Sequence, residues 1–200
     1  VNKVWFNPDP AVEYKPPFKA DGSERYPDAD YESAWRDGYA QSGDIDLSEE
    51  VPHEYNQFDT FDFTSYWVSS DGGYYFEFDD SNAGCNGNEF DNDCYTLVEV
   101  NNASDDLKQR YANWYSYYRT RELAARAGIS EAFLVLNDGV RLGWGAINEG
   151  GTLVQGVRRY DTDGSEAFRN FLYNENASGG TPLRRALEDV VRSACREITA

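Results

Sequence analysis

Side chains able to perform acid–base, nucleophilic or metal chemistry are unevenly represented in this sequence. It holds one histidine, His53, three cysteines and 36 aspartates and glutamates. A single imidazole leaves almost nothing from which to build a histidine-based triad, a Cys–His dyad or a multi-histidine zinc site. Neither a G-x-G-x-x-G run nor a P-loop pattern occurs, and with so many carboxylates any glycosidase-like pair is expected by chance. The sequence therefore predicts a protein that is not an enzyme.

The Thr181 hydroxyl lies in a stretch of sequence where it could contact a ligand. Thr181 follows Gly179 and Gly180 and precedes Pro182 in the run "GGTPL". Threonine is a good helix N-cap, and proline suits the first helical position because no N–H is needed there. The two glycines let the backbone approach another group closely. Thr181 is thus predicted to cap a helix, and the residues alone leave open whether its hydroxyl also faces a ligand.

The cysteines indicate a compartment. Cys85 and Cys94 flank the polar run "NGNEFDND". We predict a disulfide between them, which would contribute about 2–3 kcal/mol by closing a short loop. Such a bond implies an oxidising location outside the cytoplasm. Cys195 is left over, either as a buried free thiol or with a partner outside residues 1–200.

The segment around this loop also offers hard oxygen atoms of the type that Ca²⁺ prefers. The spacing of an EF-hand is not met. A calcium site and an ordinary disulfide-tied loop are both left open here. The candidate ligands are Asp79, Asp80, Asn82, Asn88, Asp91 and Asp93.

Charge divides the chain near residue 104. Residues 1–104 hold 23 acidic and 5 basic side chains, whereas residues 105–200 hold 13 of each. A surface with this much negative charge repels nucleic acid and anionic membranes. Separately, no apolar run in the sequence is long enough to cross a bilayer. The sequence starts at Val1, with no Met and no leader-like pattern, which predicts a processed or trimmed end. We expect one acidic, aromatic-rich region over 1–104 and a neutral domain over 105–200.

Secondary-structure signals change at the same place. Four prolines in "WFNPDPAVEYKPPF" favour extended segments and turns. Alternating phenylalanines at 61–63 and 76–78, around an Asp-Gly-Gly turn, predict a β-hairpin, and "NDCYTLVEV" is a further strand candidate. Ser104 is predicted to cap a long helix over 105–136, loosened at Gly128, whose aromatic cluster at 114–118 needs cover on two sides.

The remaining residues alternate between strand and helix patterns. "VRLGWGAIN" and "TLVQGVRRY" predict two strands close enough to form a hairpin, and "SEAFRNFLY" predicts a short helix. From Pro182 to about Arg196, apolar residues recur at helical spacing, which predicts a final helix with one face on a core. The order helix, strand, strand, helix, helix indicates an α/β fold whose sheet is only partly present.

Several stretches resemble a known family. The run "YANWYSYYRTRELAARAGISEAF" at 111–133, then "VRLGWGAIN", "FRNFLY" and "GGTPLRRALEDV", is similar to the PilC/PilY family of type IV pilus tip-associated adhesin and assembly proteins. The early runs "FNPDPAVEYKPP" and "YESAWRDGY" also resemble that family. The resemblance covers most of the chain, with residues 105–192 the most specific part and about 44–93 matching nothing.

The resemblance implies a partial von Willebrand factor A-like, Rossmann-type core at 105–200 with a large, mostly irregular and β-containing insertion at 1–104. It implies a non-enzymatic protein of the bacterial cell surface or pilus tip, acting in pilus assembly and adhesion. Its partners would be pilus or minor pilin subunits and a host or surface receptor. A divalent cation, Mg²⁺ or Ca²⁺, would bind Thr181 only where flanking sequence supplies the other two loops of the site.

Two rival functions remain at this level. The chain could be a self-assembling extracellular filament subunit whose sheet edge a neighbouring molecule completes by strand addition. It could also be a secreted carbohydrate-active enzyme that uses two acidic residues and an aromatic sugar platform.

Overall fold

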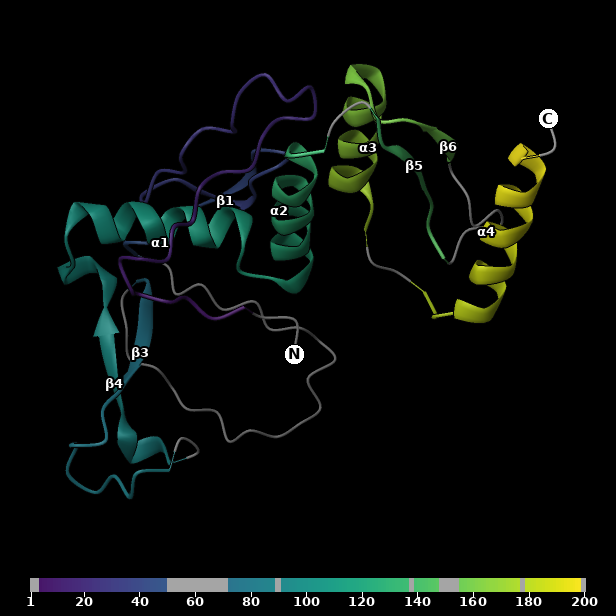
Figure 1. The fold of residues 1–200 in the computed structure, drawn as a ribbon. Helices are drawn as coiled ribbons and strands as arrows, with labels where there is room; N and C mark the ends of the chain where they lie inside the picture. The colour runs from purple at the N-terminus through teal and green to yellow at the C-terminus, as the bar shows by residue number, and fades with distance from the viewer. Residues whose placement is uncertain are drawn as a thin grey trace. The chain divides into compact units, whose positions relative to one another are not determined.

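A computed structural model describes residues 4–49, 72–88, 91–136, 139–147, 155–176 and 179–198 (Figure 1). These residues form a mixed α/β structure with four α-helices and three two-stranded antiparallel sheets. The chain divides into two compact units. The first comprises residues 1–16 and 27–124, and the second comprises 17–26 and 125–200.

Helix α1 (Asp105–Tyr117) forms the centre of the first unit. It begins as predicted, because the Ser104 side chain accepts a hydrogen bond from the Leu107 backbone N–H. Tyr111 and Tyr115 are fully buried on it, packed in a core with Phe6 and Leu47. Extended chain from the proline-rich first region therefore covers one side of α1.

The predicted helix over 105–136 is two helices rather than one. Helix α1 ends at Tyr117, the backbone of Tyr118 leaves the helical region with φ −135° and ψ −16°, and α2 (Arg121–Leu134) follows. The Thr120 hydroxyl accepts from the Leu123 backbone N–H, so α2 starts with a cap of its own. The prediction of a loosened helix at Gly128 was wrong, since Gly128 lies within α2.

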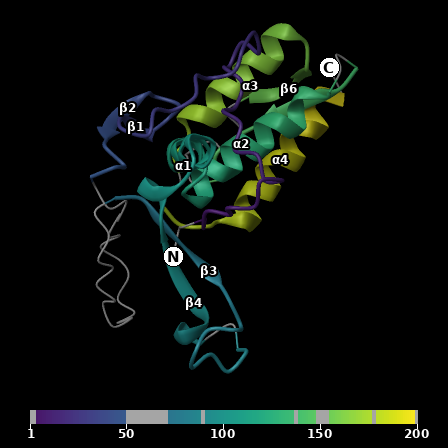
Figure 2. The same ribbon diagram turned by 90° about the vertical axis from the view of Figure 1, so that its left-hand side faces the viewer.

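Two hairpins belong to the first unit. Strands β1 (Ala34–Asp37) and β2 (Ser42–Ile45) form one, and β3 (Tyr74–Phe78) and β4 (Tyr95–Glu99) form the other. Figures 1 and 2 show the β3–β4 hairpin extending away from α1. The strand partner described for β3 is thus the third predicted strand, and residues 61–63 lie outside the described residues. Single 3-10 turns, η1 (Asn92–Cys94) and η2 (Val100–Asn102), flank β4.

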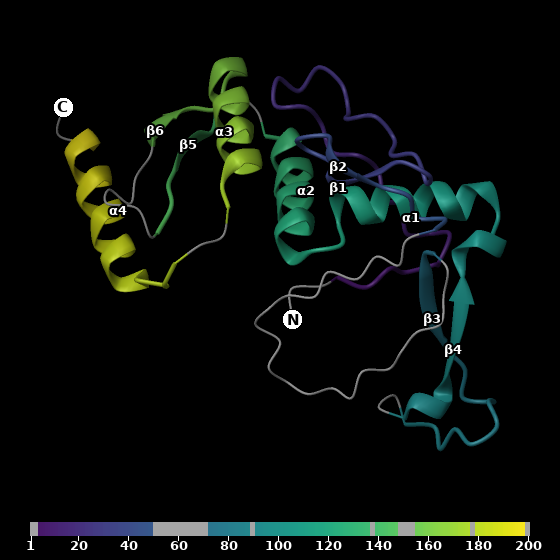
Figure 3. The ribbon, with the colours of Figure 1, turned by 180° about the vertical axis from the view of Figure 1, so that it is seen from behind.

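The second unit holds the predicted strand–strand–helix order (Figure 3). Strand β5 (Arg141–Trp144) pairs with β6 (Gln155–Arg159), and α3 (Thr162–Asn174) follows. Trp144, Tyr160 and Phe168 form its core. The Asp161 carboxylate accepts from the Gly164 backbone N–H and caps α3.

Residues 17–26 are tied into this unit by partly buried polar contacts. The Arg169 guanidinium on α3 donates from Nε to the Ala20 carbonyl at 2.7 Å. The Tyr173 hydroxyl donates to the Phe18 carbonyl at 2.6 Å, and Arg25 forms an ion pair with Glu131 on α2. Arg169 is 4% exposed, so its hydrogen bonds are shielded from water and hold the segment on α3.

Helix α4 (Leu183–Ile198) corrects one expectation about packing. Only Ala186 on its apolar face is buried among the residues whose side chains the structure describes. Leu183 and Leu187 are 65% and 64% exposed, and Val190 and Val191 are exposed as well. The apolar residues of α4 do lie on one face of the helix, as their spacing predicts. In the described part of the chain, however, that face is not packed against a hydrophobic core.

The compact units are cut differently from the charge-based division at residue 104. Helix α1 packs with the residues before it, so the first unit extends to residue 124. Charge composition follows the solvated surface, whereas a compact unit follows shared burial, so the two boundaries need not coincide. Among the described helices, none is both long and apolar enough to cross a membrane.

Candidate functional site

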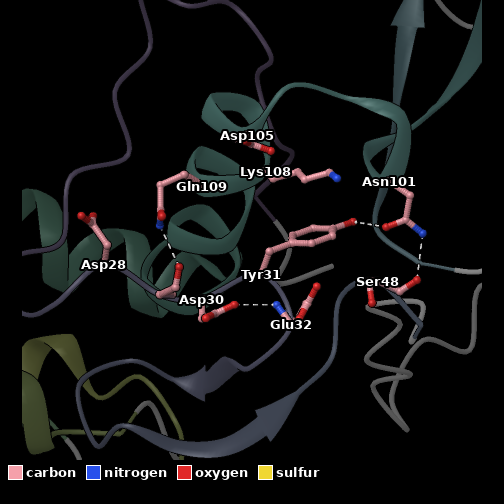
Figure 4. A pocket seen from close by; sticks show the side chains of 10 residues that line it. Asp28, Asp30, Tyr31, Glu32, Ser48, Asn101, Asp105, Lys108 and Gln109 are labelled. Carbon is pink, nitrogen blue, oxygen red and sulfur yellow. Dashed lines mark hydrogen bonds between the residues drawn. The ribbon is translucent and has the colours of Figure 1, made fainter.

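A polar hollow of about 500 Å³ opens on the first unit beside the start of α1 (Figure 4). Residues 28–32 line one wall, Ser48 and Asn101 another, and the first turns of α1 the third. The side chains on α1 are Asp105, Lys108 and Gln109, which helical spacing brings to one end of the helix. The lining is rich in carboxylates, with Lys108 as its single lysine or arginine.

Tyr31 crosses the hollow and is held at both sides. Its hydroxyl donates to Asn101 Oδ1 at 3.0 Å, and Asn101 Nδ2 donates to the Ser48 carbonyl at 2.8 Å. The Lys108 ammonium lies 5.9 Å from the centre of the Tyr31 ring. Burial raises the pKa of Tyr31 to about 12, with a smaller contribution from the Asp46 carboxylate. Tyr31 therefore stays neutral at physiological pH.

The other polar groups around the hollow support the backbone. Gln109 Nε2 donates to the Ala29 carbonyl at 2.7 Å, and Asp30 Oδ1 accepts from the Glu32 backbone N–H at 2.9 Å. Asp28 Oδ1 accepts from Asn113 Nδ2 at 2.8 Å. These bonds explain the lining as a structural network at the start of α1. They provide neither a nucleophile with an adjacent base nor an oxyanion-binding pair.

The prediction of Thr181 as the helix N-cap was wrong, because Pro182 is the residue directly before α4 and Thr181 lies one residue ahead of that cap position. Helix α4 starts at Leu183, and the first of its backbone bonds runs from the Ala186 N–H to the Pro182 carbonyl at 3.0 Å. Thr181 is exposed and borders a shallow depression that also holds Arg184, Arg185 and Glu188. Among the described residues no group of three or more His, Cys, Asp or Glu could hold a metal ion. Thr181 and its described neighbours therefore do not by themselves fit a cation.

The predicted pair Cys85 and Cys94 is joined by a disulfide, with 4.6 Å between the two Cα atoms. Before the loop, Asp79 accepts from the Ser81 backbone N–H and hydroxyl, and within it Asp91 accepts from the Asn86 and Asp93 backbone N–H groups. Two of the carboxylates proposed for calcium thus stabilise the loop through turns of their own. His53 lies outside the described residues.

Comparison with known proteins gives a family. The type IV pilus biogenesis factor PilY1 of Pseudomonas aeruginosa strain PAO1 is 34% identical over an alignment 205 residues long, which includes 91% of this chain. The PilY1 proteins of strains PAK and UCBPP-PA14 are 29% and 31% identical over 93% and 94% of the chain. The chain belongs to the PilC/PilY family.

The matched region is a small part of these PilC/PilY proteins. The chain spans about 17% of the length of each of the three relatives. No protein-family profile matches it, and no solved structure does. The relationship therefore rests on the sequence itself, over nearly the whole of this chain.

Sequence reasoning assigned no binding surface to this PilC/PilY chain, and the fold brings one group of exposed aromatic side chains together. Phe76, Phe78 and Tyr95 are exposed together on the β3–β4 hairpin. The signal in the sequence was alternation, because Phe76 and Phe78 lie two residues apart, as do Tyr95 and Leu97. What the alternation could not give was the pairing of these two runs.

Proposed function

We propose that this chain is part of a cell-surface, pilus tip-associated protein of a bacterium that acts in pilus assembly and adhesion without enzymatic activity. The observation that carries the proposal is 34% identity over 91% of the chain with a protein named type IV pilus biogenesis factor. The absence of a nucleophile–base pair around the described hollow is compatible with a binding role. The Cys85–Cys94 disulfide is compatible with a location outside the cytoplasm.

The second part of the proposal concerns the core. We propose that residues 105–200 contribute to a von Willebrand factor A-like core, with residues 1–104 as an insertion. The element order α2, β5, β6, α3, α4 supports it. In the whole protein Thr181 would supply one hydroxyl to a Mg²⁺ or Ca²⁺ ion, and carboxylates from other segments would supply the rest.

Partners follow from the same proposal. Assembly requires contact with pilus or minor pilin subunits, and adhesion requires contact with a host or surface receptor. The acidic, aromatic-rich first region is suited to such contacts, because tyrosine and tryptophan offer a large contact area at low entropic cost.

The β3–β4 hairpin gives a clean test of adhesion. The Val100 N–H donates to the Gly73 carbonyl at 2.9 Å, so the two ends of the hairpin lie side by side. In the gene of the whole protein, residues 74–99 would be replaced by Asn-Gly, a tight two-residue turn. Surface pili would be counted after shearing, and attachment would be measured on the same cells. We expect pili to assemble and attachment to fall.

Two further strains complete this design. A strain lacking the whole gene is the reference for pilus assembly and should lose surface pili. A strain with Trp5→Ser changes an exposed aromatic residue outside the hairpin and should attach normally. Normal pili in the strain without the gene would contradict the assembly role, and normal attachment after hairpin replacement would contradict the adhesive role of this region.

A further inference from the structure

The β3–β4 hairpin has two faces of different character. In the antiparallel register Tyr75 pairs with Val98, and both side chains pack on the α1 core. Paired residues in a sheet point to the same side, so the alternate positions form the opposite side. That side, named here the aromatic face, consists of Tyr74, Phe76, Phe78, Tyr95, Leu97 and Glu99.

The aromatic face is open to solvent. Phe76 is 42% exposed and Phe78 is 47% exposed, and Tyr95 is also exposed. Their rings are ordered by contacts with each other: Tyr74 and Phe76 lie 5.7 Å apart between ring centres, and Phe78 and Tyr95 lie 5.5 Å apart. Exposed aromatic side chains gathered on one face of a strand pair are typical of a binding surface.

Charge around this face has one sign. Residues 37–107 contain no lysine or arginine, and residues 74–99 contain seven aspartates and glutamates. Glu99, the partner of Tyr74 in the register, is exposed on the aromatic face, and Asp80 and Asp93 are exposed at the far end of the hairpin. The hydroxyl and backbone N–H of Ser81 hold the pKa of Asp79 below its usual range, so that this carboxylate remains charged. A partner that approaches the hairpin is selected for positive charge.

The outer edge of the hairpin indicates how a partner could bind, as an added strand. Among the described residues the sheet contains β3 and β4 alone, so beyond Tyr74, whose backbone groups are bonded to the Tyr111 hydroxyl, the outer edge of β3 has backbone groups able to pair with a further strand. The Cys85–Cys94 disulfide and the Asn82 Nδ2 to Thr96 Oγ1 hydrogen bond of 3.0 Å fix the far end of the hairpin. An extended segment would thus meet a preformed template.

We propose that the aromatic face of the β3–β4 hairpin docks an extended segment of another protein that carries lysine or arginine at alternate positions. The cationic heads would lie over the rings and near the carboxylates, and the aliphatic stems would cover the exposed aromatic carbon. A second copy of this chain is disfavoured, since it would bring two acidic hairpins together. The inference deepens the proposed function by assigning the surface and the chemical class of its contact.

The test uses the purified 200-residue chain and labelled peptides. The probe is a capped peptide of five Lys-Thr repeats, which is extended and carries cations on one side. Comparison peptides are five Glu-Thr repeats and five Lys-Pro repeats, the latter with the same charge but no N–H at each proline. Fluorescence anisotropy should show binding of the Lys-Thr peptide, weaker binding of the Lys-Pro peptide and none of the Glu-Thr peptide.

Two variants of the chain locate the binding. Phe76→Thr with Phe78→Thr keeps strand propensity and removes two rings, and should weaken the Lys-Thr peptide about tenfold or more. Trp5→Ser is the matched control, because Trp5 is 72% exposed and lies outside the hairpin, and it should bind as the unchanged chain does. Circular dichroism and thermal melting should be the same for all three chains, since each altered residue is exposed.

A second pair of substitutions tests the charge. Glu99→Gln with Asp80→Asn should weaken binding of the Lys-Thr peptide severalfold while all the rings of the aromatic face remain. Unchanged affinity in either double variant, or equal affinity for the Lys-Thr and Lys-Pro peptides, would overturn the inference. Such a result would leave the pilus role standing, because that role is tested on cells by pilus counts and attachment.

Discussion

The hydroxyl of Tyr111 on α1 pairs with both backbone groups of Tyr74 at the start of β3. It donates to the Tyr74 carbonyl at 2.9 Å and accepts from the Tyr74 N–H at 3.2 Å. The Tyr111 ring packs edge to face on Phe6, with ring centres 5.0 Å apart. One buried side chain therefore ties the root of the β3–β4 hairpin to the core of the first unit.

Tyr111→Phe should loosen the hairpin without disturbing the packing of the ring. The substitution leaves two backbone groups of Tyr74 without their partner, which should lower the free energy of unfolding by about 1–3 kcal/mol. Urea unfolding measures the total, and amide hydrogen exchange should show faster exchange in β3 and β4. Tyr118→Phe is the control, since the Tyr118 hydroxyl donates to the Lys15 carbonyl in an exposed position. Equal midpoints for the Tyr111→Phe variant and the unchanged chain would contradict this role.

Stability should fall in alkaline solution. Burial raises the pKa of Tyr31 to about 12 and that of Tyr173 to about 12, each above the usual value of about 10. The unfolded chain ionises these tyrosines first, so their contribution is complete below about pH 10 and is lost as the pH rises toward 12. Denaturant unfolding at fixed pH values should show the decline. The double variant Tyr31→Phe, Tyr173→Phe should decline less, and an identical decline would exclude these two tyrosines as its source.

Gly128→Ala should stabilise the protein. Gly128 lies inside α2, and a Cβ built there meets nothing within 4 Å. Alanine in place of an interior helical glycine raises the free energy of unfolding by about 0.5–1 kcal/mol, because the backbone of alanine loses less conformational entropy on folding than that of glycine. The matched control is Gly22→Ala, where φ is +73° and the new Cβ would approach Arg169 Nη2 to 2.7 Å. Thermal melting should rise for the first variant and fall for the second; a fall for Gly128→Ala would mean that α2 requires glycine there.

The apolar face of α4 should tolerate polar substitution in this chain. Leu187 is 64% exposed, so Leu187→Ser should change the free energy of unfolding by about 0.5 kcal/mol or less. Phe168→Ala in the buried core of the same unit should cost about 3–5 kcal/mol. Urea unfolding of both variants gives the comparison. A loss for Leu187→Ser as large as that for Phe168→Ala would show that the α4 face is covered in solution.

Local elements were predictable wherever the signal spans a few residues. The Ser104 cap with its following aspartates marked the start of α1, and the order β5, β6, α3 followed from strand and helix periods. The end of α1 was missed because the helical spacing of apolar residues continues through Tyr118, while the backbone leaves the helix there. The Thr120 hydroxyl caps a new helix, α2, at this point. The free energy of such a cap is close to that of continuing the first helix, so the sequence pattern does not distinguish the two.

The candidate binding surface was predictable only in its composition. The alternating phenylalanines at 76–78, the alternating Tyr95 and Leu97, and the absence of basic residues around them are visible in the chain itself. Their joint exposure is not, because the same alternation serves a buried strand equally well. Tyr75 on the opposite side, packed in the α1 core, decides which face remains open.

The sequence alone thus determined the local elements, the acidic character of residues 1–104, the short-loop cysteine pair and the family resemblance, since each depends on residues near one another or on composition. Only the tertiary structure decided that β3 pairs with β4, that α1 and α2 are separate, and that the α4 face lies exposed. Strand pairing and burial depend on which distant segments exclude water together. That choice is a balance of chain entropy against packing over the whole unit, and no short stretch of residues encodes it.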